Sequence, residues 1–333
     1  MVFRRPVLGV VTGILVLVAQ ALAAPPPASG AAASPAVSAT WSGTRFEADQ
    51  AARVSGTVTR ARSLRAAVLQ RQTPDGWRSV ARLRLDDGRF AGRVPTTWYG
   101  SFRYRVRVTT RGGTVGWSDV ATVRVVPSYD PPGVATAHRL ASPSPVARWD
   151  PCRVIGYRVN ARQARPGALR DVKGALRRVH QATGLRFAYR GTTRLVPQSW
   201  EDGYPRDTQL VIAWARPGQS LVLGRSTGAM GVGGAAWQLG YRDARGTTVS
   251  RIVRGYVVID SSQQSRTPAG FGRGKTRGEL LMHESAHAMG LAHVEDRRQL
   301  MHPFMQDTPA RWGRGDLAGL AKLGAARGCL HQR

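Results

Sequence analysis

Three histidines at fixed spacing are the residues of this chain best able to do chemistry. His283 and His287 are four residues apart, so on an α-helix they share one face and can present imidazole nitrogens to one metal ion. Glu284 follows His283 and would lie beside that ion, where its carboxylate can accept a proton from water. The spacing therefore predicts a catalytic zinc site with Glu284 as the catalytic base.

The residues after this helix provide a third ligand. Gly290 can adopt a backbone conformation that other residues resist, which lets the chain leave the helix and bring His293 to the ion. Three histidine ligands leave the fourth position of a tetrahedral zinc ion open. A structural or accidental metal site is the alternative, and the clustering of four of the seven histidines at 283–302 disfavours it. We expect one catalytic Zn²⁺, and the sequence leaves structural Ca²⁺ open.

A second motif follows the histidines, Leu300-Met301-His302-Pro303. With the H-E-x-x-H-x-x-G-x-x-H pattern at 283–293, it resembles the metzincin zinc metallopeptidases, and it is closest to the bacterial, actinobacterial matrixin-like branch. The resemblance implies that Met301 forms an apolar floor, the Met-turn, beneath the zinc ligands. It also implies an α+β catalytic domain with a twisted mixed sheet, an active-site helix, the Met-turn and a C-terminal helix.

The activity implied by this resemblance is that of a zinc metalloendopeptidase. Such an enzyme hydrolyses peptide bonds of a protein or peptide substrate with a zinc-activated water, and Glu284 would be the general base. Two other classes stay open. One is a non-enzymatic cell-wall-associated binding protein, which the retention of Glu284 argues against. The other is a zinc hydrolase acting on cell-wall amide bonds, which the Met-turn motif disfavours.

The length and charge of the 333-residue chain limit its organisation and the kinds of partner it can bind. A length of this order predicts two folded units with linkers. The net charge of +29 includes only three lysines, and the arginines are spread along the chain rather than clustered. In an exported protein this argues against nucleic acid as a partner. It leaves a solvated basic surface, or attraction to anionic cell-wall polymers, as alternatives.

The first residues have the pattern of an export signal. Arg4 and Arg5 precede an apolar run from Val7 to Leu22, and the small residues around position 23 are typical of a cleavage site. We therefore expect a signal peptide at 1–23 and a secreted, extracellular protein with no stable membrane anchor after cleavage. An uncleaved signal anchor is the alternative.

Two cysteines remain in the chain, Cys152 and Cys329. In an exported protein such an isolated pair most often forms a disulfide, and this one would bracket the zinc motif. The alternative is a Cys152 thiolate bound to zinc in a latent form. The residues around Cys152 do not resemble the motif of such a switch.

The order of patterns along the chain predicts a modular organisation. Residues 24–39 and the Pro-rich segment 127–148 are expected to be linkers. Residues 40–126 show alternating apolar and basic residues with Asp-Gly turns, which resembles an immunoglobulin-like or fibronectin type III β-sandwich. Residues 149–333 would form the zinc metallopeptidase domain.

Within that last segment the periodicity predicts helices and strands in alternation. Helices are expected at 168–183, at 277–289 and from about Asp316, and strands at 154–160, 185–189, 209–214 and 256–259. The glycine-rich segment 228–237 is expected to be either a strand that holds substrate or a mobile loop.

Overall fold

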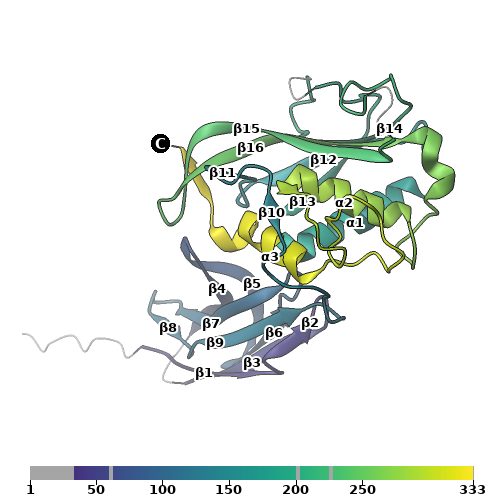
Figure 1. The fold of residues 1–333 in the computed structure, drawn as a ribbon. Helices are drawn as coiled ribbons and strands as arrows, with labels where there is room; N and C mark the ends of the chain where they lie inside the picture. Colours follow the sequence, from purple (N-terminus) through teal and green to yellow (C-terminus); the bar gives the residue numbers. More distant parts are fainter. Residues whose placement is uncertain (1–33, 60–62, 200–202, 225–227, 333) are drawn as a thin grey trace, which may run out of the picture. The chain divides into compact units, whose positions relative to one another are not determined.

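The computed structural model describes residues 34–59, 63–199, 203–224 and 228–332. The signal peptide expected at 1–23 lies outside these ranges. Within them, no helix is both long and apolar enough to cross a membrane. The described residues form two large β-sheet assemblies, one separate pair of short strands and three α-helices (Figure 1).

The first assembly consists of nine strands with the order β1-β3-β6-β5-β4-β7-β9-β2, and β8 pairs with β7. The strands are β1 (Ala36–Trp41), β2 (Arg45–Glu47), β3 (Ala52–Thr59), β4 (Leu64–Thr73), β5 (Gly76–Asp86), β6 (Arg89–Val94), β7 (Gly100–Thr110), β8 (Val115–Trp117) and β9 (Ala121–Val126). The first part of β5 pairs with β4 and its last residues pair with β6, so β5 passes from one part of the sheet to the other.

The alternation noted in the sequence gives this assembly its core. On β7, Phe102, Tyr104 and Val106 are buried, whereas Arg103 between them is exposed. The buried residues of β7 pack with Val54 of β3 and with apolar residues of the other strands in one cluster. A strand of period two thus separates a core face from a basic solvent face.

The second assembly is a seven-stranded mixed sheet with the order β13-β12-β14-β16-β15-β18, in which β11 also pairs with β16. The strands are β11 (Val146–Arg148), β12 (Val154–Asn160), β13 (Arg186–Thr192), β14 (Leu210–Ala215), β15 (Gly231–Asp243), β16 (Thr248–Asp260) and β18 (Leu330–Gln332). Strands β11 to β14 and β16 pair in parallel, and β15 is antiparallel to both β16 and β18. A short pair of β10 (Arg139–Leu140) and β17 (Leu291–Ala292) lies apart from it.

Helices α1 (Ala168–Thr183) and α2 (Arg277–Met289) pack against this sheet, and α3 (Arg314–Leu323) packs against α1 and α2. Short 3₁₀ turns lie at Ser261–Arg266 and Ala325–Arg327. The helical spacing of Val172, Leu176 and Val179 places all three in the core, where they join residues of the sheet, α2 and α3. Gly184 ends α1 with φ +71°, a conformation that a residue with Cβ resists.

The α+β fold class expected from the sequence, a β-sandwich followed by a metzincin-like catalytic domain, is wrong. Strands make up 42% of the described structure and helices 17%, so the chain is mostly β, with curled mixed sheets. Much of the difference comes from β15 and β16, each 13 residues long. For these two strands the apolar pattern predicted strand at 256–259 and left 228–237 open between strand and loop, because glycines in β15 and arginines in β16 interrupt it.

A disulfide joins Cys152 and Cys329, whose Cα atoms are 5.4 Å apart. It connects the segment before β12 to the segment before β18. The carboxylate of Asp150 reinforces the same junction, because its Oδ1 accepts the backbone N–H groups of Cys152 and Leu330 at 3.0 and 3.3 Å.

Candidate metal centre

Helix α2 carries the first two histidines. Thr276 caps its start, since the side-chain oxygen accepts the backbone N–H of Glu279 at 3.2 Å. Gly290 ends the helix with φ +110°, and its N–H donates to the carbonyls of the last turn. The helix therefore ends at Gly290, as the sequence predicted, and the following turn leads to His293.

The three histidines come together at one point. The Nε2 atoms of His283 and His287 are 3.2 Å apart, and each lies 3.0 Å from Nε2 of His293. A tetrahedral zinc ion with Zn–N bonds of about 2.0–2.1 Å would place its nitrogen ligands about 3.3 Å apart. The observed spacing is close to that value, so the three nitrogens fit one ion.

The hydrogen bonds of the rings indicate which nitrogen of each ring carries the proton. Nδ1 of His283 lies 2.8 Å from the carbonyl oxygen of Leu300, and Nδ1 of His287 lies 2.8 Å from that of Leu291. A carbonyl only accepts, so both Nδ1 atoms carry the proton and both Nε2 atoms of the neutral rings hold lone pairs. Two lone pairs facing each other repel unless a cation lies between them. The donor set therefore fits a metal ion such as Zn²⁺.

Burial keeps these rings neutral. It lowers the pKa of His283 to about 3, and the neighbouring His287 acts in the same direction. Burial likewise lowers the pKa of His287 to about 4, and it lowers the pKa of the more exposed His293. Neutral imidazole is the form that binds a metal, so the three rings are in a form that can bind one at neutral pH.

Glu284 lies beside the cluster and is 5% exposed. Burial raises the pKa of its carboxyl to about 8, and the hydrogen bond from the backbone N–H of Gly233 acts against this rise. A cation held by the histidines would lower the pKa again and favour the ionised form that a base requires. The carboxyl of Glu284 is therefore placed where it could accept a proton from a water molecule next to the histidines.

The glycines of β15 explain how strand and helix meet here. A Cβ added to Gly233 would overlap the backbone carbonyl of Glu284, and one added to Gly231 would lie 3.0 Å from Cγ of the same residue. The glycine-rich segment is therefore a strand in close contact with α2, except for Gly228 to Met230, which precede β15.

Met301 is 1% exposed and belongs to the apolar core that includes α2. Its place next to Leu300 is held by Asp316, a residue whose role the sequence analysis missed. The Asp316 carboxylate accepts the backbone N–H groups of Leu300 at 2.6 Å and Met301 at 3.2 Å. Since the Leu300 carbonyl accepts the proton of His283 Nδ1, Asp316 helps to position His283 through the backbone.

The last helix was expected from about Asp316, a residue type that often caps a helix, but Asp316 is not its cap. The cap is Gly313, three residues earlier, and its N–H also donates to Asp316 at 2.8 Å. An aspartate near a helix start has the same sequence pattern whether it caps the helix or also fixes a distant turn. Spacing therefore could not distinguish the two roles.

Replacing Asp316 by asparagine should weaken zinc binding by about 10–100-fold, the range for residues that orient metal ligands. The amide has one accepting oxygen where the carboxylate has two, so some of the three N–H groups lose their acceptor. Competition with a chromophoric chelator measures the affinity. Asp130→Asn is the matched control, because Asp130 is exposed and pairs with Arg314, away from the histidines. Equal zinc affinity in the folded Asp316 variant would contradict this role.

A cleft of about 670 Å³ opens onto the histidines and Glu284. Leu280, Phe304 and Met305 form part of its apolar wall, and Phe304 is 73% exposed. Arg266 and Lys275 also line it. The cleft therefore combines the three histidines, Glu284, an apolar surface and two basic side chains.

A further group of potential ligands in the described ranges is Asp75, Cys152 and Cys329. The two sulfurs of that group form the disulfide, so they are not thiolates.

Comparisons with known proteins give no family for the chain. No family model and no curated protein matches it. Fibronectin type III-like modules of Clostridium thermocellum CbhA match with a TM-score of 0.20 and 19% identity, over 26% of this chain and 93% of theirs. A pectate lyase from Pectobacterium carotovorum matches with a TM-score of 0.20 and 12% identity, over 38% of this chain.

A polysaccharide deacetylase from Bacillus cereus matches with a TM-score of 0.21 and 5% identity, over 54% of this chain and 59% of its own. This chain spans 33% of the pectate lyase. Similarities at this level carry no argument about function, and none of the three is a metzincin.

Proposed function

We propose that this chain is a zinc-dependent endopeptidase. The observation that carries the proposal is the convergence of three histidine Nε2 atoms, 3.0 to 3.2 Å apart, beside the buried carboxyl of Glu284. The resemblance of 283–303 to the metzincin motifs gives the reaction class, hydrolysis of a peptide bond. The resemblance concerns these motifs and not the fold class.

Each residue has a defined part in this proposal. His283, His287 and His293 would hold zinc, which supplies a Lewis acid that polarises the scissile carbonyl and makes water more acidic. Glu284 accepts the proton of the attacking water and delivers it to the leaving amine. The Gly233 N–H holds the carboxyl in place, and Met301 keeps the space below the ligands apolar.

The edge of β15 gives the substrate a place to bind. One edge of Gly231–Gln238 pairs with β16, while β18 pairs only with Tyr241–Asp243. No other strand of the described ranges pairs with the second edge of Gly231–Gln238. An extended peptide can therefore add to this edge as a further strand, with its backbone hydrogen-bonded across the cleft.

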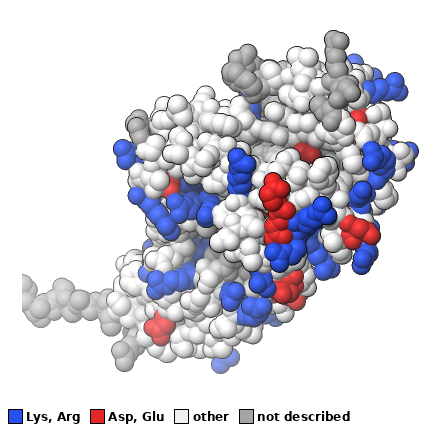
Figure 2. All heavy atoms as spheres, in the orientation of Figure 1, with Lys and Arg blue, Asp and Glu red and all other residues white. Residues whose placement is uncertain are grey.

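The proposal includes export, which rests on the signal pattern at 1–23. The basic side chains that give the net charge of +29 are spread over the face drawn in Figure 2. Binding to anionic cell-wall polymers stays a prediction, because a charge spread in this way defines no single surface.

Metal removal tests the proposal directly. We expect the purified mature chain to contain about one zinc ion and to hydrolyse casein, and we expect a chelator to abolish hydrolysis. Added Zn²⁺ should restore it, whereas added Mg²⁺ should not, because imidazole nitrogens suit zinc and magnesium prefers oxygen ligands. Casein hydrolysis that persists in metal-free protein would refute the proposal.

A further inference from the structure

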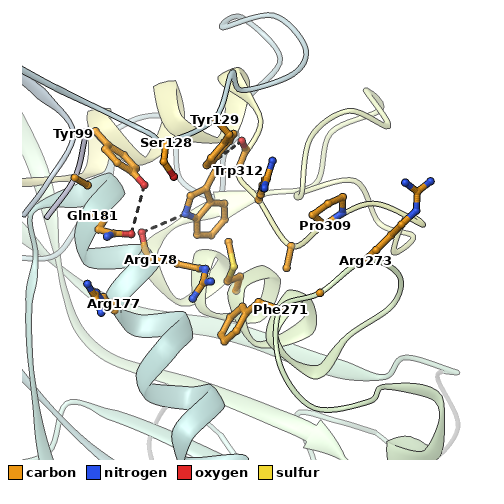
Figure 3. Close-up of a pocket in the computed structure, with 15 residues that line it drawn as sticks. Tyr99, Ser128, Tyr129, Arg177, Arg178, Gln181, Phe271, Arg273, Pro309 and Trp312 are labelled. Carbon is orange, nitrogen blue, oxygen red and sulfur yellow. Dashed lines mark hydrogen bonds between the residues drawn. The ribbon is translucent and has the colours of Figure 1, made fainter. Parts of the chain in front are cut away.

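A second cavity, of about 600 Å³, shares no lining residue with the histidine cleft. Figure 3 shows the groups around it, which come from α1, Met282 of α2, the loop at 271–273, the segment 309–312, Ser128 and Tyr129, and Ala48 and Tyr99 of the first assembly. Backbone and side-chain contacts hold these parts together. Tyr99 N–H donates to Gln181 O at 2.7 Å, and Arg177 pairs with Asp49 at 2.7 Å.

The charges around this cavity have one sign. Four arginines line it and, among the described residues, no aspartate or glutamate does. The four are Arg177, Arg178, Arg273 and Arg311. Arg177 is neutralised by Asp49, and none of the ion pairs within the described ranges involves the other three. The cavity therefore carries a surplus of positive charge.

Two of these arginines are held by aromatic rings. Cζ of Arg178 lies 3.7 Å from the ring centre of Phe271, and Cζ of Arg311 lies 5.0 Å from that of Tyr129. Nη1 of Arg178 also donates to the Gly174 carbonyl at 3.2 Å. A ring against the flat face of a guanidinium leaves the N–H groups along its edge available, and that edge matches the oxygens of a carboxylate or phosphate.

Arg178 is also partly removed from water. Burial lowers the pKa of its guanidinium, and the neighbouring Arg177 acts in the same direction. A half-buried charge without a partner of opposite sign is costly, and a bound anion would offset that cost. The hydroxyl group of Ser128 lines the same cavity and adds a hydrogen-bond donor, whereas the hydroxyl of Tyr99 donates to Gln181 Oε1 at 3.5 Å (Figure 3).

We propose that this cavity binds a ligand that carries an oxyanion, either a carboxylate or a phosphate group. Arg178 and Arg311, fixed by Phe271 and Tyr129, would contact the anion. Arg273, which is exposed, would add attraction at longer range. The site is independent of the proposed hydrolysis, because it uses neither the histidines nor Glu284.

Isothermal titration of the mature chain with inorganic phosphate and with glutarate tests the proposal, in a buffer whose ionic strength is matched with chloride. We expect saturable binding of one anion per chain for at least one of the two, with an affinity that falls as salt is raised. Binding of phosphate alone or of glutarate alone assigns the ligand class. The same titration of His293→Ala shows that the heat does not come from anions bound to zinc.

Arg178→Gln and Arg311→Gln should each weaken binding by about 10-fold or more, since each removes a charge-assisted hydrogen bond. Arg190→Gln is the matched control, because Arg190 is exposed on β13 and lies outside the cavity. Arg273→Gln serves if either of these substitutions prevents folding, and a weakening of binding by it alone also supports the site. The proposal fails if neither anion binds saturably. It also fails if every cavity variant that folds binds as tightly as Arg190→Gln.

Discussion

Replacing Glu284 by glutamine is expected to lower the rate of casein hydrolysis by about 10²–10⁴, the usual contribution of a general base. Glutamine keeps the size of the side chain, and its oxygen can still accept the N–H of Gly233, which donates to the carboxyl of Glu284. It cannot take a proton from water. The three histidines are untouched, so zinc content should stay at about one ion per chain.

The matched control for this experiment is Glu295→Gln. Glu295 is exposed and lies two residues after His293, so the variant makes the same change of charge near the site without reaching the cleft. Hydrolysis in this control should equal that of the unmodified chain. A Glu284→Gln protein that retains near-normal hydrolysis would exclude Glu284 as the base.

Replacing His293 by alanine should remove both zinc and hydrolysis. Two imidazoles remain, and structural and catalytic zinc sites use three or four protein ligands. His293 is the most exposed of the three histidines and lies after the end of α2, so its loss leaves the apolar core intact. Metal analysis by mass spectrometry, together with casein hydrolysis and a circular dichroism melt, separates loss of metal from loss of fold.

His331→Ala is the matched control, because His331 is exposed and lies near the end of β18. It should leave zinc content unchanged. If His293→Ala kept full zinc occupancy and hydrolysis, the convergence of the three nitrogens would be unrelated to function, and the proposed metal centre would be wrong.

The elements that the sequence predicted well are those defined by local signals. The helices Ala168–Thr183 and Arg277–Met289 and the strand Val154–Asn160 occur where the patterns placed them. In each helix the end coincides with a glycine at positive φ, Gly184 or Gly290. Periodicity and glycine are local properties of the chain, so one sequence is sufficient to read them.

The features that the sequence did not reveal depend on distant contacts. Gly233 looked ambiguous between strand and loop, because the partner that requires a glycine there is Glu284, on a separate helix. The ion pair of Asp49 and Arg177 spans 128 residues of chain. The balance of strand and helix was also misjudged, because β16 continues through arginines that interrupt its apolar pattern.

The disulfide has a consequence for how damage to the chain would be detected. Cys152 and Cys329 are 177 residues apart, and the segment between them contains α1, α2 and the three histidines. One backbone cut anywhere within that segment leaves the two fragments covalently joined. Under denaturing conditions without reductant they would therefore migrate as a single species of unchanged mass, apart from one added water. Self-cleavage inside this loop becomes visible as two fragments only when the sulfur–sulfur bond is reduced.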